Sequence, residues 1–125
     1  MASHPTRVLI VDDHADMRES TKHLLEKLGY QVETAPDGAA ALRAQRARGF
    51  HAILTDIFMA GVEGMETIAS FKRDWPDVRV VAMSGGGMVS KKDYLEAALQ
   101  VGADATLQKP FTLQALIAAL TDGKA

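Results

Sequence analysis

Short apolar runs alternate along the chain with longer segments in which apolar residues recur at helical spacing. The short runs have the length and the strand-like residues of buried strands. They lie at residues 8–11, 30–34, 52–55, 78–83 and 105–108. Turn-forming or polar residues follow each run, so the pattern predicts five separate strands.

The longer segments place their apolar residues on one face of a helix. In the first of them Leu24, Leu25 and Leu28 recur at helical spacing, and Gly29 follows as a terminator. Gly49 and Gly102 end two later segments in the same way. The pattern predicts helices over residues 17–28, 39–48, 65–74, 90–101 and 113–120.

Five strands that alternate with five helices predict a parallel sheet. Right-handed crossovers then cover both faces of that sheet with helices, which is a doubly wound α/β architecture. A length of 125 residues is the size of one domain. We expect one domain over residues 7–121, with flexible termini at residues 1–6 and 122–125.

Acidic residues follow two of the predicted strands. Asp12 and Asp13 come directly after the first, Asp56 comes after the third, and Lys109 comes after the fifth. Ligands of parallel α/β sheets bind beyond the carboxyl ends of the strands, so these side chains are expected to converge. Carboxylates about 4 Å apart repel by about 4 kcal/mol per pair. A hard cation such as Mg²⁺ relieves that repulsion, and Lys109 would face a phosphate.

Each of these residues also has an ordinary structural explanation. Asp13 alone is as well explained by capping of the first helix as by ligand binding. Asp56 could begin a turn, and a lysine such as Lys109 is usually solvated, although Pro110 constrains its backbone. Ser84 and the glycines after it could form a plain loop or an anion site. The coincidence of four such residues at strand ends favours a functional site.

Composition narrows the classes of function. Fourteen basic and 16 acidic residues give a formal charge of −2, which attracts neither nucleic acid nor anionic membrane strongly. With no cysteine, disulfides and thiolate metal sites are excluded. The first apolar run is too short for a signal peptide or a membrane span, so a cytoplasmic protein is expected. The four histidines share no metal-ligand spacing, and His14 is interpreted as a surface residue at a helix start.

These motifs together resemble the receiver domain of two-component response regulators. The matching segments are residues 8–13, residues 53–56 with Met59 and Gly64, residues 81–85, and residues 102–104 leading into Lys109-Pro110-Phe111. The resemblance covers nearly the whole chain. It implies a flavodoxin-like fold with strand order 2-1-3-4-5 and a phosphorylation switch. In that switch Asp56 accepts a phosphoryl group from a histidine kinase or phosphotransfer protein.

The resemblance also implies roles for the residues around Asp56. Mg²⁺ would be held by the carboxylates and one backbone carbonyl, and the phosphoryl group by a hydroxyl, a backbone amide and an amine. The implied metal ligands are Asp12, Asp13, Asp56 and the carbonyl of Phe58, and the implied phosphoryl-binding residues are Ser84, Gly85 and Lys109. The Lys109-Pro110 bond is implied to be cis. A downstream partner, or a second copy in a homodimer, would bind the surface formed by residues 91–120.

Three features depart from the family pattern. Thr106 stands where receivers usually carry an aromatic switch residue, so an aromatic switch cannot operate. Ala60 replaces a common proline, and the glycine run after Ser84 is longer than in most receivers.

We therefore expect a stand-alone phosphoacceptor signalling module with no separate substrate turnover. One alternative is a degenerate receiver that acts as a constitutive interaction module. Another is a flavodoxin-like electron carrier, which Asp12 and Asp13 disfavour because they would repel the flavin phosphate.

Overall fold

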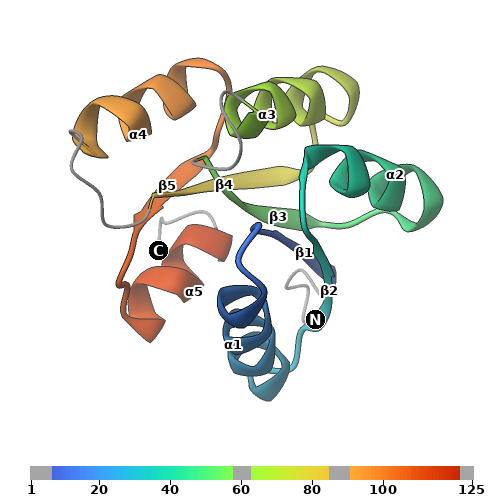
Figure 1. Ribbon diagram of the computed structural model, residues 1–125, viewed down its shortest axis with the longest axis vertical. Helices are drawn as coiled ribbons and strands as arrows, with labels where there is room; N and C mark the ends of the chain where they lie inside the picture. Colours follow the sequence, from blue (N-terminus) through green and yellow to red (C-terminus); the bar gives the residue numbers. More distant parts are fainter. Residues whose placement is uncertain (1–6, 58–62, 85–90, 122–125) are drawn as a thin grey trace.

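A computed structural model describes residues 7–57, 63–84 and 91–121 of the chain. Strands and helices alternate throughout (Figure 1). Their bounds are β1 Arg7–Val11, α1 Ala15–Lys27, β2 Gln31–Ala35, α2 Gly38–Arg48, β3 Ala52–Asp56, α3 Glu63–Asp74, β4 Arg79–Ser84, α4 Lys91–Gln100, β5 Ala105–Gln108 and α5 Leu113–Thr121. The termini expected to be flexible lie outside the described residues.

The five strands form one parallel sheet in the order β2-β1-β3-β4-β5. Helices α1 and α5 cover one face, and α2, α3 and α4 cover the other (Figure 1). The predicted doubly wound architecture and its strand order are therefore confirmed. Because every strand runs the same way, all five carboxyl ends lie at one edge of the sheet.

Two apolar clusters hold the helices against the sheet, one on each face. Side chains of β1 alternate between them: Val8 and Ile10 pack with Leu25 of α1, whereas Leu9 packs with Phe71 of α3. All five of these side chains are fully buried or nearly so. Burial of a large apolar side chain contributes about 1.5–3 kcal/mol, so this alternation fixes the register of the central strand.

Most elements differ from the sequence prediction by one or two residues at an end, and the differences in β3, β4 and α3 concern the site. Asp56 and Ser84 are the last residues of β3 and β4, not the first residues after them. The backbone ladder explains the difference, since Asp56 pairs with Met83 and Ser84 pairs with Gln108. Backbone hydrogen bonds thus extend both strands by one polar residue, which the hydrophobic pattern could not predict. Helix α3 also begins two residues earlier than predicted, at Glu63.

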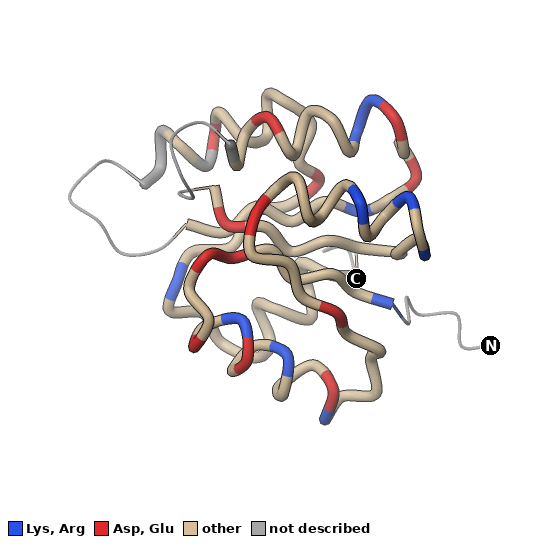
Figure 2. Tube along the Cα trace, turned by 45° about the vertical axis from the view of Figure 1, so that its right-hand side comes forward, with Lys and Arg blue, Asp and Glu red and all other residues tan. Residues whose placement is uncertain are grey.

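The surface mixes charges of both signs. Figure 2 shows Lys and Arg segments interspersed with Asp and Glu segments along the helices, so no face of one sign is visible in this view. No helix within residues 7–57, 63–84 and 91–121 is long and apolar enough to cross a membrane.

Gly64 lets the first turn of α3 lie directly against the end of β3. A Cβ atom at Gly64 would stand 2.5 Å from the Ile57 Cα atom and 2.7 Å from the Ile57 carbonyl oxygen. Both neighbours are backbone atoms, which cannot rotate out of the way. The glycine therefore sets how closely α3 approaches the strand that carries Asp56.

We expect Gly64→Ala to destabilise the protein by about 1–3 kcal/mol, because the added methyl group clashes with backbone. This loss outweighs the gain of about 1 kcal/mol that alanine brings to an ordinary helical position. Urea unfolding followed by circular dichroism measures the change. Glu66→Ala, an exposed position on the same helix, is the control and should stay within about 0.5 kcal/mol of wild type. An alanine variant as stable as wild type would contradict the close approach.

Candidate functional site

The turn after β1 buries one acidic side chain and leaves its neighbour accessible. The Asp12 side chain is fully buried, whereas 45% of the Asp13 side chain is exposed. The backbone N–H of Asp12 donates to the Ala35 carbonyl at 3.2 Å, which ties the turn to the end of β2. Asp12 Oδ1 accepts the backbone N–H of His14 at 2.9 Å. The N-cap of α1 is His14, without a side-chain cap, so Asp13 is not the helix cap.

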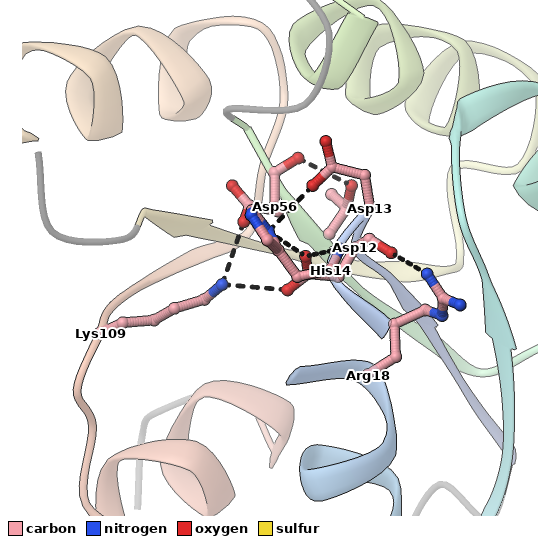
Figure 3. Close-up of polar contacts among 7 residues, drawn as sticks. Asp12, Asp13, His14, Arg18, Asp56 and Lys109 are labelled. Atoms are coloured by element: carbon pink, nitrogen blue, oxygen red, sulfur yellow. Dashed lines mark hydrogen bonds and ion pairs between the residues drawn. The ribbon is translucent and has the colours of Figure 1, made fainter. Parts of the chain in front are cut away.

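Lys109 contacts residues at the carboxyl ends of β1, β3 and β4, and Figure 3 shows its side chain directed toward Asp12 and Asp56. Its Nζ atom lies 3.0 Å from Asp12 Oδ2 and 3.0 Å from Asp56 Oδ2. Its backbone N–H donates to the Ser84 carbonyl at 2.8 Å, and a cis peptide bond links it to Pro110. The sequence places these residues far apart, and the sheet brings them together at its carboxyl edge.

The environment of Lys109 keeps its amine charged. Burial alone would lower the pKa of the ammonium group. Hydrogen bonds and charge attraction from Asp56 and then Asp12 outweigh that effect, so the pKa of Lys109 is raised above its ordinary value. Only 11% of the Lys109 side chain is exposed, so solvent screens these ion pairs weakly. One ammonium group thus neutralises part of the charge of two buried carboxylates.

His14 contacts both acidic residues of the turn from the solvent side. Its Nδ1 atom lies 3.1 Å from Asp13 Oδ1 and 3.3 Å from Asp12 Oδ1 (Figure 3). The side chain is 74% exposed, in agreement with its interpretation as a surface residue at a helix start. The sequence did not lead us to predict its contacts with the two aspartates, although its position directly after an Asp-Asp pair at a strand end could have indicated them. Arg18 steadies the turn by donating to the Asp12 carbonyl at 2.9 Å.

The donor groups of this site fit a divalent cation. Possible ligand atoms of Asp12, Asp13 and His14 all lie within 4.8 Å of one another. Asp56 is connected to this group through its shared ion pair with Lys109. Carboxylate oxygens are the ligands that hard cations take, and one exposed carboxylate beside two buried ones gives an ion access from solvent.

The remaining predicted residues lie around this centre or outside the described chain. Ser84 is fully buried at the end of β4, and Thr106 is half-buried in β5, where it pairs with Ala82. Phe58 and Gly85, with Met59 and Ala60 of the acceptor loop, lie outside the described residues.

Comparison with known proteins gives one consistent family. The model of the response regulator receiver domain matches residues 8–121. Response regulator MprA of Mycobacterium sp. (strain KMS) is 34% identical over 114 residues, which are 91% of this chain and 48% of that protein. The chain therefore spans about half the length of this curated relative.

Solved structures agree with the family model. The receiver domain of NtrX from Brucella abortus has a TM-score of 0.81 and 30% identity, covering 90% of this chain and 97% of that one. Response regulator TrrA from Thermotoga maritima, solved in complex with Mg²⁺-BeF, has a TM-score of 0.77 and 26% identity, covering 90% and 93%. Taken with the acidic turn, Asp56 and Lys109 at one sheet edge, these matches show that the chain belongs to the receiver domain family of two-component response regulators.

Proposed function

We propose that this chain is a phosphoacceptor of a two-component phosphorelay, with Asp56 as the residue that is phosphorylated. The observation that carries the proposal is the Lys109 ammonium group, which lies 3.0 Å from an oxygen of Asp56 and is also paired with Asp12. It places a fixed positive charge where a phosphoryl group on Asp56 would carry negative charge.

The proposed reaction is a direct transfer. A carboxylate oxygen of Asp56 attacks the phosphorus of a phosphohistidine donor, the O–P bond of an acyl phosphate forms, and the N–P bond breaks. The departing imidazole takes up a proton from solvent. Lys109 pairs with Asp56 before the transfer and with a phosphoryl oxygen after it. Such transfers need positioning and charge neutralisation more than covalent chemistry. The domain thus promotes its own modification and has no separate substrate to turn over.

Mg²⁺ is the proposed cation. Its ligands would be Asp12, Asp13, Asp56 and the carbonyl of Phe58, and when bound it supplies charge neutralisation for the transferred phosphoryl group. The complex of the related TrrA with Mg²⁺-BeF supports this choice.

Other residues complete the proposed phosphoryl site. The Ser84 hydroxyl and the Gly85 backbone N–H would donate to phosphoryl oxygens. Thr106 occupies the switch position without an aromatic ring, so an aromatic switch cannot operate there.

The proposed partners follow from the family. A histidine kinase or phosphotransfer protein would donate to Asp56, and residues 91–120 would bind a downstream protein or a second copy. The helices there leave apolar side chains exposed: Tyr94, Leu99 and Leu113 are 38%, 47% and 42% exposed. We propose that residues 7–121 act as one unit in the cytoplasm. The buried Asp12 and the paired Lys109 disfavour both an electron carrier and a degenerate receiver, because neither of these functions needs a buried charged site.

We expect wild-type protein to be labelled by radioactive acetyl phosphate when Mg²⁺ is present and to lose the label when EDTA is added first. Asp56→Asn should abolish labelling, because an amide cannot form the acyl phosphate. Asp77→Asn, a change at an exposed aspartate, is the control and should label like wild type. Equal labelling of the Asp56→Asn variant and wild type, or none in either, would falsify the assignment.

We expect Lys109→Met to destabilise the protein by about 3 kcal/mol at pH 7.5 in EDTA, because two buried carboxylates lose their counterion. The pKa of Lys109 is raised in the fold, so its contribution is complete below the unfolded lysine pKa of about 10.4 and is lost only at higher pH. Because pH 5 and pH 7.5 both lie below that pKa, the contribution of Lys109 should be present at both pH values.

Urea unfolding at both pH values measures this difference, and added Mg²⁺ should recover part of it by binding the folded state. Lys27→Met, at an exposed position in the last turn of α1, is the matched control and should change stability by less than about 0.5 kcal/mol. Equal stability of wild type and the Lys109→Met variant at pH 7.5 would show that the shared ion pair contributes nothing.

A further inference from the structure

The acidic turn meets a positive or donor group on each of its two sides. On the buried side Asp12 Oδ2 pairs with Lys109 at 3.0 Å. On the solvent side Asp12 Oδ1 and Asp13 Oδ1 both face the Nδ1 atom of His14, at 3.3 and 3.1 Å. The proposed phosphoryl chemistry uses Lys109 and leaves the imidazole without a role.

The geometry around His14 suits a shared metal ion. Nitrogen and oxygen ligands about 2.1 Å from one ion, at angles of about 90–110°, lie about 3.0–3.4 Å apart. The two separations from His14 Nδ1 fall in that range. Asp12 Oδ1 already accepts the backbone N–H of His14 at 2.9 Å, so it does not depend on the imidazole for a hydrogen-bond partner.

We propose that His14 adds a nitrogen ligand to Asp12 and Asp13, so that this turn binds Zn²⁺ or Mn²⁺ in addition to Mg²⁺. The inference rests on the proposed function only in placing a divalent cation at this end of the sheet. Imidazole is a good ligand for transition metals, whereas Mg²⁺ takes oxygen ligands and retains water. His14 should therefore strengthen binding of Zn²⁺ and Mn²⁺ much more than binding of Mg²⁺.

The position of His14 makes this inference testable without unfolding the protein. Its side chain is 74% exposed and supports no side-chain cap of α1, so replacing it leaves the core and the helix start intact. Glutamine keeps a polar side chain of similar length and removes the ring nitrogens. His23 is an exposed histidine on the same helix, nine residues further along, or about 13 Å at 1.5 Å per residue.

The experiment is isothermal titration calorimetry of wild type, His14→Gln and His23→Gln with Mg²⁺, Zn²⁺ and Mn²⁺. We expect His14→Gln to weaken Zn²⁺ binding by about tenfold or more and Mg²⁺ binding by less than about threefold. His23→Gln should bind all three ions like wild type. Electron spin-echo modulation of bound Mn²⁺ should show imidazole nitrogen in wild type and His23→Gln, and lose it in His14→Gln.

The outcomes separate this inference from the proposed function. Zn²⁺ binding and nitrogen modulation that persist unchanged in His14→Gln would overturn the inference, because His14 would then be hydrogen-bonded to the acidic pair only. Labelling of Asp56 with Mg²⁺ would still stand in that case. Loss of Zn²⁺ binding in His14→Gln would support the inference even if Asp56 were not labelled. A wild-type protein that binds none of the three ions would overturn the inference whatever the labelling result.

Discussion

The shared ion pair of Lys109 with Asp12 and Asp56 is the interaction on which the site depends. Two buried carboxylates at one sheet edge would repel each other. The Lys109 ammonium group, 3.0 Å from an oxygen of each, offsets that repulsion. The proposed nucleophile, Asp56, therefore lies in a largely desolvated place, where charges interact strongly. The same group that stabilises the folded acids is also the group that would meet a phosphoryl oxygen.

The parallel sheet makes this meeting of charges possible. Each of the three residues ends or follows a strand, and the two apolar clusters fix the strand registers from opposite faces. Gly64 allows α3 to approach Ile57, so the backbone beside Asp56 is held closely by the helix that follows it. The carboxylates are therefore positioned by packing and ladder hydrogen bonds made elsewhere in the domain. A charged centre of this kind needs a rigid frame, because each ion pair weakens quickly with distance.

Most of the architecture could be predicted from the chain because apolar periodicity reports directly on burial. It placed all ten elements in the right order, and the doubly wound arrangement followed from their alternation. It was less accurate at element ends. Asp56 and Ser84 are polar, so pattern placed them beyond their strands, whereas backbone pairing with Met83 and Gln108 includes them. Backbone hydrogen bonds between strands do not depend on side-chain polarity. The hydrophobic pattern therefore cannot locate the last residue of a strand.

The order of residues along the chain was enough to indicate that acidic groups and a lysine follow strand ends, and hence to predict a common site. It could not show which of these side chains would be buried and which residues each would contact. Folding buries Asp12 completely, leaves Asp13 accessible, and turns His14 toward both, because the N-cap falls on His14 and Asp12 accepts its backbone N–H. Those arrangements depend on backbone direction at a single turn and on distances between segments up to 97 residues apart, as between Asp12 and Lys109. Neither the backbone direction at this turn nor the distance between such segments can be predicted from the local sequence, because both are set by the packing of the whole domain.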